Sequence, residues 1–299
     1  MRFWVDAWDP GYGTSAELDA STAEVDTSVE TAAWAPVPAA PTQVPPAVHF
    51  VDGVRRVDAH LWIDGPDGVV GGLAASYAAG VVSCRDGEAR ADVVEVRRGL
   101  FTPAPGAVDV ATPLARYEVH QARTAEAADL SFALQNAMAA TEVDCALRAR
   151  TGADDLVVVD GPLLRHRQLA RALGLVKTQA ASYLPAGPDA VVGALGAGER
   201  TPVFRIVQPW SRCSWYLRLP GRPGAPWAGV VRVECPDLPA DDVVALATLS
   251  QAVLPRYASA EHKDQRAPQN LYPIGGLERL LRRRLGDPTL LDRQLRRAA

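Results

Sequence analysis

Two short apolar segments that each end in Asp-Gly constrain the fold of this chain most strongly. They read VHFVDG at Val48–Gly53 and LVVVDG at Leu156–Gly161. Apolar runs of this kind are typical of strands buried on both faces. A carboxylate that closes such a strand is costly to bury without a cation, and open α/β sheets place ligands beyond their strand ends. The repeat predicts that Asp52 and Asp160 meet at one sheet edge, although each alone also fits an Asp that begins a turn.

Length and composition set the class of protein. With 299 residues, 48% of them hydrophobic, the chain can bury the core of one large domain or two small ones. It shows neither a secretory signal nor an apolar run of about 20 residues, so we expect a cytoplasmic protein without a membrane anchor. The cysteines are widely spaced and include no C-x-x-C pair, which argues against a zinc cluster and favours reduced thiols; they are Cys84, Cys145, Cys213 and Cys235.

Charge is distributed unevenly along the chain. The net charge of −4 gives no general attraction to nucleic acid, but ten Lys or Arg face five acids from Arg256 onward. This asymmetry allows a local basic surface, or merely a solvated face. At the other end, residues 1–46 are acidic and rich in Pro and Ala, which indicates an arm and linker ahead of a main domain at 47–299. Docking on a partner and covering its own domain are both open for this arm.

After Ala47 the pattern becomes β-like, and a long helix follows. Turn signals at 65–68 and 85–87 separate apolar stretches, which predicts a meander of about three antiparallel strands that begins with the Asp52 strand. The stretch 124–150 has helical periodicity, with Thr124 as its expected N-cap. Leu130, Leu134 and Met138 repeat every four residues, and the next position is Glu142. Glu142 either reaches water at the edge of this stripe or points with it toward the sheet.

Beyond Asp160 we expect further strands and helices. The predicted helices are 162–173, 241–254, 277–285 and a last one from about 289, and the predicted strands are 203–207, 215–219 and 229–234. Residues 187–198 are expected to be loop-rich, and 261–273 irregular but full of hydrogen-bonding side chains.

The order of strand with Asp, meander, helix with Glu and strand with Asp fits an RNase H-like α/β fold, a mixed sheet flanked by helices. In such a sheet the first strand lies beside the fourth, so Asp52, Glu142 and Asp160 can converge. Three hard oxygen ligands suit Mn²⁺ or Mg²⁺, and two such ions about 4 Å apart promote phosphodiester cleavage. Without metal the three charges would repel one another.

Five segments taken together resemble the NurA nuclease family. They are VHFVDGVRR, AMAATEVDCALRA, DDLVVVDGPLL, GLVKT and RAPQNLYPIGGLERLL, and they span roughly residues 46–285. The resemblance implies an RNase H-like, Mn²⁺- or Mg²⁺-dependent DNA nuclease that forms a homodimeric ring. It also implies partnership with a HerA-type hexameric ATPase in DNA end processing, for double-strand break repair or defence. The expected products carry a 5′-phosphate and a 3′-hydroxyl.

The resemblance also implies roles for single residues. It makes Asp52, Glu142 and Asp160 the metal-binding acids, Tyr272 a tyrosine near the metals and Lys177 the matching lysine of the segment after the second Asp-Gly. From the residues alone, Lys177 either stabilises charge on a phosphate or is a solvated strand end. Tyr272 is otherwise a packed loop residue.

The chain departs from the family at its C-terminal motif, where Leu277-Glu278-Arg279-Leu280 replaces the usual Ala-His or Ala-Asp pair. His262, Asp264 or Glu278 is then the candidate fourth ligand. A catalytically inactive adaptor that docks on a motor ATPase is therefore the main alternative, and an enzyme that cleaves RNA or a DNA–RNA hybrid is another.

Basic residues close to the two Asp-Gly motifs are the candidate DNA contacts. Arg55 and Arg56 follow Asp52, and Arg165 and Arg167 follow Asp160 at an expected helix start, a suitable place to meet a phosphate backbone. The histidines at 60, 120 and 166 have no partner pattern and are expected to be structural.

Overall fold

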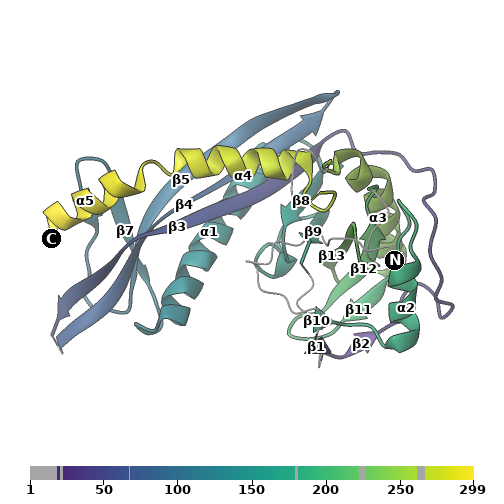
Figure 1. Cartoon of the computed structure of the whole chain (residues 1–299), viewed down its shortest axis with the longest axis horizontal. Coiled ribbons are helices and arrows are strands. Elements are labelled where there is room, and N and C mark those ends of the chain that lie inside the picture. The colour runs from purple at the N-terminus through teal and green to yellow at the C-terminus, as the bar shows by residue number, and fades with distance from the viewer. Residues whose placement is uncertain (1–18, 21–22, 67, 179–180, 222–226, 261–266) are drawn as a thin grey trace, which may run out of the picture. The chain divides into compact units, whose positions relative to one another are not determined.

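The computed structural model describes residues 19–20, 23–66, 68–178, 181–221, 227–260 and 267–299. The chain divides into two compact units, each built from separate stretches of sequence. Unit 1 comprises residues 1–50, 85–87 and 152–275, and unit 2 comprises residues 51–84, 88–151 and 276–299. Figure 1 labels the helices and strands that are named below.

Unit 2 is built on long strands. Its neighbouring strands are, in order, β3 (Val48–Gly65, whose first three residues belong to unit 1), β4 (Gly68–Arg85), β5 (Glu88–Thr102), β7 (Arg116–Gln121) and β6 (Val110–Ala111). Two-residue connections join β3 to β4 and β4 to β5, so these neighbours are antiparallel. Asp86 and Gly87 between β4 and β5 have φ of 51° and 78°, as a type I′ turn requires. The expected three-strand meander is confirmed, with strands longer than the sequence indicated.

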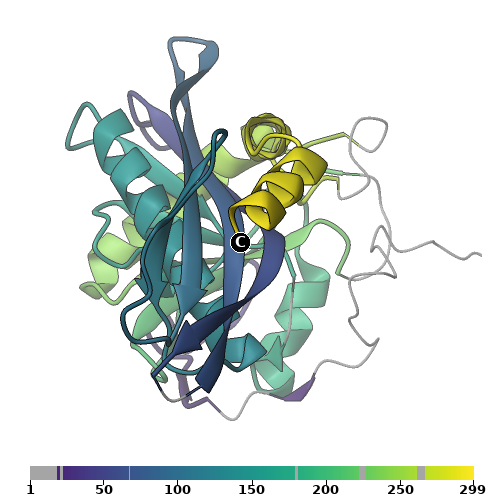
Figure 2. The ribbon, with the colours of Figure 1, turned by 90° about the vertical axis from the view of Figure 1, so that its left-hand side faces the viewer.

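Helices cover both faces of the unit 2 strands (Figures 1 and 2). Helix α1 (Ala127–Ala149) packs Leu130 and Leu134 against Leu73 and Tyr77. On the other face Leu295 of α5 (Pro288–Ala298) packs against Ala74. Helix α4 (Tyr272–Arg284) belongs to unit 2 from Gly276 onward. A Cβ on Gly80 would lie 3.1 Å from Leu277 and 3.2 Å from Leu281, so a glycine lets α4 lie directly on β4.

Unit 1 contains a second group of neighbouring strands. They are, in order, β2 (Val25–Asp26), β11 (Phe204–Ile206), β12 (Arg212–Arg218), β13 (Val230–Pro236), β9 (Ala172–Val176), β8 (Leu156–Asp160) and the start of β3. Strands β8 and β9 are parallel, whereas β9, β13, β12, β11 and β2 pair antiparallel. Separately, β1 (Asp19–Ala20) pairs with β10 (Ala181–Ser182).

The helices of unit 1 lie on opposite faces of its strands. Trp215 of β12 donates to Ser250 of α3 (Ala240–Val253) at 3.0 Å. The next residue, Tyr216, points the other way and packs with Val192 of α2 (Ala186–Ala194). Short 3₁₀ turns, η2 (Leu163–Arg165) and η3 (Leu254–Tyr257), complete the unit.

A buried hydrogen bond between side chains holds the start of β3 beside the start of β8. His49 Nε2 lies 3.0 Å from Asp155 Oδ2, and their side chains are 0% and 2% exposed. Asp155 Oδ2 also accepts from the Gly152 N–H at 2.9 Å, and the Leu156 N–H donates to the Ala47 carbonyl at 3.0 Å. The two Asp-Gly strands are therefore neighbours, as their sequences predict.

The strand order confirms the expected fold class. Through β3, the order is β5-β4-β3-β8-β9, so the first strand of the meander lies beside the strand that follows the long helix. This is the RNase H-like arrangement, a mixed α/β fold with a large mixed sheet flanked by helices, and the additional strands and helices are present. None of the helices in the described part of the chain is both long and apolar enough to cross a bilayer.

Three local predictions are wrong. Residues 162–173 form η2 and the start of β9 rather than a helix, because Ala172–Val176 pairs with strands on both sides and this tertiary pairing overrides local propensity. The long helix begins at Ala127 with Glu126 as N-cap. Thr124 instead accepts from the Glu126 N–H and donates to Asp129. Residues 187–194, expected in a loop, belong to α2.

Candidate active site

Glu142 lies against the glycine that follows Asp52, and all three residues belong to unit 2. A Cβ placed on Gly53 would be 2.3 Å from Glu142 Oε1 and 3.0 Å from Met138 Cγ. The helix glutamate therefore occupies space that only glycine leaves open. Glu142 is 5% exposed. Of the two orientations that the sequence leaves open, Glu142 has the one toward the sheet and not the one that reaches water.

Asp52 is held close to its own backbone at this point of β3. It is 8% exposed, and its Oδ1 accepts a hydrogen bond from the Gly53 N–H at 2.8 Å. Two carboxylates thus flank Gly53, one on the preceding residue and one on α1. Carboxylate oxygens at such a position are hard ligands of the kind that Mg²⁺ and Mn²⁺ prefer.

We expect Gly53→Ala to lower activity while sparing the fold. The added methyl group displaces the Glu142 carboxylate, which is the mobile end of a side chain, and a catalytic group misplaced by about 1 Å can cost about 10²-fold in rate. Stability should change by no more than about 1 kcal/mol, since Ala costs little at an extended position. Cleavage rates and thermal unfolding measure the two effects.

Gly276→Ala is the matched control, because a Cβ there meets no described atom within 4 Å. It should keep the wild-type rate. A Gly53→Ala protein that also keeps this rate would contradict the placement of Glu142 in the site.

Asp160 belongs to unit 1, where it pairs with a lysine. It is the last residue of β8 and lies opposite Leu175 of β9. Lys177, two residues beyond Leu175, therefore points to the same face of the sheet. Its Nζ donates to Asp160 Oδ2 at 2.7 Å and to Asn270 Oδ1 at 3.0 Å. The side chain of Lys177 is 14% exposed, so the alternative of a solvated strand end is wrong.

Asn270 is a site residue that sequence reasoning missed. It is 1% exposed and helps hold the Lys177 ammonium beside Asp160. The sequence indicates only that Asn270 lies in the polar stretch 261–273, which is rich in hydrogen-bonding side chains. An amide inside such a stretch cannot be assigned a partner without the fold.

A buried network of two arginines and one glutamate supports the turn after Asp160. Glu234 of β13 is 0% exposed, and its Oε1 accepts from the Leu163 N–H at 2.7 Å. Its Oε2 accepts from Arg232 Nη1 at 2.6 Å and Arg212 Nε at 3.2 Å. Gly161, between Asp160 and this anchor, has φ of 108°, which L side chains rarely adopt. No local pattern in the sequence predicts this network.

Tyr272 is the first residue of α4 rather than a packed loop residue. It is 42% exposed, and its hydroxyl accepts from the Ala260 N–H at 3.1 Å. Its expected role near metal ions stays a prediction. The candidate fourth ligands His262 and Asp264 lie outside the described residues.

The four candidate DNA-contacting arginines differ in their surroundings. Arg55 Nη1 donates to Ser131 of α1, to Oγ at 3.2 Å and to the carbonyl at 3.4 Å. Arg56 pairs instead with Asp58 at 3.0 Å and donates to the Gly286 carbonyl at 2.8 Å. Arg165 is half-buried in η2 and Arg167 is exposed just beyond it, so neither lies on the helix that was expected there.

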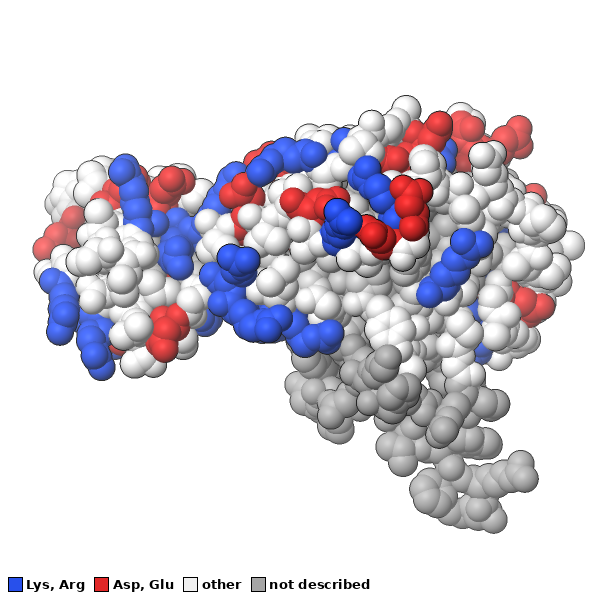
Figure 3. Space-filling model, turned by 90° about the horizontal axis from the view of Figure 1, so that it is seen from above, with Lys and Arg blue, Asp and Glu red and all other residues white. Residues whose placement is uncertain are grey.

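Exposed arginines also line the C-terminal helices, as the sequence predicts. Figure 3 shows blue side chains, interspersed with acidic ones, over this face of the molecule. The exposed arginines of α4 and α5 are Arg279, Arg282, Arg283, Arg284, Arg293, Arg296 and Arg297. Two of them form i,i+4 pairs, Arg282 with Glu278 and Arg296 with Asp292. Glu278 is thus paired on α4, and its candidate role as a fourth ligand stays a prediction.

The three candidate metal-binding acids are divided between the two units. Asp52 and Glu142 belong to unit 2 and Asp160 to unit 1. Across the described ranges, no group of three or more His, Cys, Asp and Glu side chains is gathered as a metal site. The donors suit Mn²⁺ or Mg²⁺ chemically, and their convergence stays a prediction.

Comparisons with known proteins give structural likenesses only. No protein-family model matches the chain, and no curated protein does. The NurA nuclease from Sulfolobus solfataricus is similar in structure, with a TM-score of 0.48 and 13% identity over 89% of this chain and 88% of that one. Endonuclease V from Bacillus subtilis has a TM-score of 0.36 and 13% identity over 82% of this chain and 84% of that one. Both are nucleases by name.

Proposed function

We propose that this chain is a metal-dependent deoxyribonuclease that hydrolyses phosphodiester bonds. The observation that carries the proposal is the seating of the Glu142 carboxylate on Gly53, beside Asp52. An acid on the apolar stripe of a helix departs from the local pattern, and such departures are expected at functional sites. Its position on the helix, next to an aspartate within β3, is the one that an RNase H-like carboxylate site requires.

In the proposed mechanism the chain supplies the metal ligands and the ammonium group of Lys177. Asp52, Glu142 and Asp160 would hold Mn²⁺ or Mg²⁺, which supplies an activated water at neutral pH and neutralises charge on the phosphate. Lys177 holds Asp160 in place through its 2.7 Å contact and adds positive charge near the phosphate. Addition of water across the bond leaves a 5′-phosphate and a 3′-hydroxyl.

Metal removal tests this proposal. We expect the purified full-length chain to cleave labelled single- or double-stranded DNA with Mn²⁺ or Mg²⁺, to stop in excess EDTA and to resume when Mn²⁺ is restored. Gel analysis of the products checks both the rate and the end chemistry. Cleavage that continues unchanged in EDTA would contradict the metal-dependent mechanism.

The altered C-terminal motif favours a second candidate function. Leu277 of that motif is buried, and Glu278 is paired with Arg282. A catalytically inactive adaptor on a motor ATPase would show no cleavage under any metal condition. An enzyme for RNA or a DNA–RNA hybrid would prefer those substrates when they compete with DNA in one assay.

The proposed partners rest on the resemblance alone. A HerA-type hexameric ATPase and a second copy of this chain are the partners that a NurA-like nuclease would have. A role in DNA end processing for repair or defence follows from the same resemblance.

A further inference from the structure

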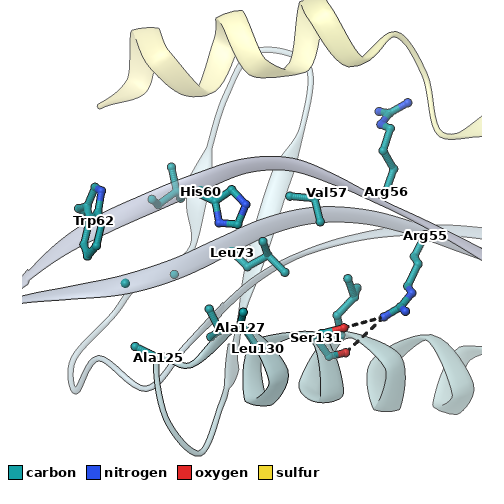
Figure 4. Close-up of a pocket in the computed structure, with 14 residues that line it drawn as sticks. Arg55, Arg56, Val57, His60, Trp62, Leu73, Ala125, Ala127, Leu130 and Ser131 are labelled. Carbon is teal, nitrogen blue, oxygen red and sulfur yellow. Dashed lines mark hydrogen bonds between the residues drawn. The ribbon is translucent and has the colours of Figure 1, made fainter.

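Unit 2 contains a groove between β3 and α1 (Figure 4), which we call the β3–α1 groove. Its volume is 440 Å³. Strand β3 lines it with Arg55, Val57, His60 and Trp62, α1 contributes Ser131, and the floor includes Gly71 of β4.

A local irregularity in β3 brings these four side chains to one groove. In a regular strand, odd and even residues face opposite ways, so Arg55 and Val57 would point away from His60 and Trp62. The exposed positions of β3 alternate with less exposed ones, but they are odd-numbered before Asp58 and even-numbered after Ala59. Such a shift is typical of a β-bulge, which redirects the side chains that follow it.

Arg55 gives the groove a positive charge. The lining includes no Asp or Glu, and its other arginine, Arg56, pairs with Asp58 at 3.0 Å. None of the described acidic side chains pairs with Arg55, whose only recorded hydrogen bonds go to Ser131. These bonds hold the guanidinium at the groove while leaving its charge uncompensated, which suits a phosphate.

Trp62 supplies a flat aromatic surface at the far end. It is 78% exposed, unusual for a large apolar side chain, and its ring lies 3.8 Å from the position of a Cβ on Gly71. One part of the indole is thus supported by β4 while the rest meets solvent. Exposed aromatic rings on a basic strand are the stacking platforms of proteins that bind single-stranded nucleic acid.

The groove leads to the candidate active site. Helix α1 runs alongside β3. Its Glu142 lies against Gly53 and its Ser131 accepts from Arg55, while Ala125, just before the helix, lies at the Trp62 end of the groove. Ten residues of strand separate Asp52 from Trp62, about 33 Å at about 3.3 Å per residue. An extended strand of several nucleotides covers such a distance, within the range of about 4 to 16 nucleotides for single-strand sites.

We propose that the β3–α1 groove binds a single strand of DNA, with an unpaired base stacked on Trp62 and a phosphate on Arg55, and leads that strand toward Asp52. This rests on the proposed nuclease function and names its substrate as unpaired DNA. A duplex fits less well, because its base faces are already stacked.

The opposite edge of α1 offers a contrast. A second groove of 780 Å³ is lined by Phe132, Arg97 and Arg123, among others. There Arg123 pairs with Asp129 at 3.0 Å and Arg97 with Asp144 at 3.3 Å, so the charges are already compensated. Phe132, 56% exposed, is therefore a matched control for Trp62.

Binding of fluorescein-labelled oligo-dT of about 12 nucleotides, followed by anisotropy in EDTA, tests the proposal without cleavage. We expect Trp62→Ala to weaken binding at least about fivefold, since a base–aromatic stack is worth about 1–3 kcal/mol, and Phe132→Ala to bind like wild type. Arg55→Gln should lower the slope of log K against log salt by about one, whereas Trp62→Ala should leave that slope unchanged.

Three results would overturn the proposal. One is wild-type affinity of Trp62→Ala for oligo-dT, and another is an equal loss of affinity for a duplex of the same length. The third is a change in oligomeric state of Trp62→Ala, which would make the groove an interface between two copies of the chain. Wild-type protein that binds oligo-dT as expected but cleaves nothing would refute the nuclease function while leaving the groove assignment intact.

Discussion

Asp52→Asn is expected to reduce DNA cleavage by about 10³-fold or more while leaving the fold intact. The amide loses the charge that a metal ligand needs, and metal-ion catalysis contributes several kcal/mol to transition-state stabilisation. The amide oxygen still accepts from the Gly53 N–H, which Asp52 binds at 2.8 Å. Cleavage of labelled DNA with Mn²⁺, together with circular dichroism, separates loss of chemistry from loss of structure.

Asp144→Asn is the matched control on the solvent side of α1. The Asp144 side chain is 53% exposed and pairs with Arg97 at 3.3 Å, so its loss should leave cleavage unchanged. If the Asp52→Asn protein cleaved DNA at the wild-type rate with Mn²⁺, Asp52 would not be a metal ligand.

The second large effect is on stability, at Glu234. Replacement by Ala leaves Arg212 and Arg232 buried without their shared carboxylate, and breaking a buried ionic network this way costs about 3–5 kcal/mol. It also removes the acceptor for the Leu163 N–H, 2.7 Å away, which anchors the turn after Asp160. We therefore expect a large drop in the free energy of unfolding and, in the folded fraction, slower cleavage. Denaturant unfolding followed by circular dichroism measures the first effect.

A surface pair provides the comparison for Glu234. Glu88 pairs with Arg90, and both side chains are more than half exposed, so Glu88→Ala should leave stability nearly unchanged. A Glu234→Ala protein that unfolds at the same denaturant concentration as Glu88→Ala would mean that the two arginines find other partners or water.

Several features of the fold could be read from the sequence because they depend on local pattern. The apolar runs before Asp52 and Asp160 predicted the paired strands, and the four-residue repeat predicted α1. Glu142 stood out as a charged residue on an apolar stripe, and the structure buries it against Gly53. Such a conflict between pattern and residue type is expected at functional sites.

Other features depend on contacts between distant segments and left no local signal. The pattern predicts a helix that ends at Leu173, yet neighbours on both sides make Ala172–Val176 a strand. At Gly174, a Cβ would lie 2.8 Å from the Gly161 carbonyl and 3.0 Å from Glu234 Cγ, so close packing requires the glycine. The pattern predicts only that Glu234 ends a strand. The two arginines reach it in the assembled sheet, so no local signal points to the network.

Strand β3 has a consequence for dissecting the molecule by truncation. Its first three residues belong to unit 1 and the rest to unit 2, and unit 1 resumes after residue 151. No single cut therefore yields either half as one uninterrupted polypeptide, and a fragment ending near residue 151 would lack β8, the neighbour of β3 in the hydrogen-bonded order. Truncated variants of this chain would lose strand partners, and their loss of activity would reflect a disrupted fold. Point substitutions are therefore the informative way to assign roles.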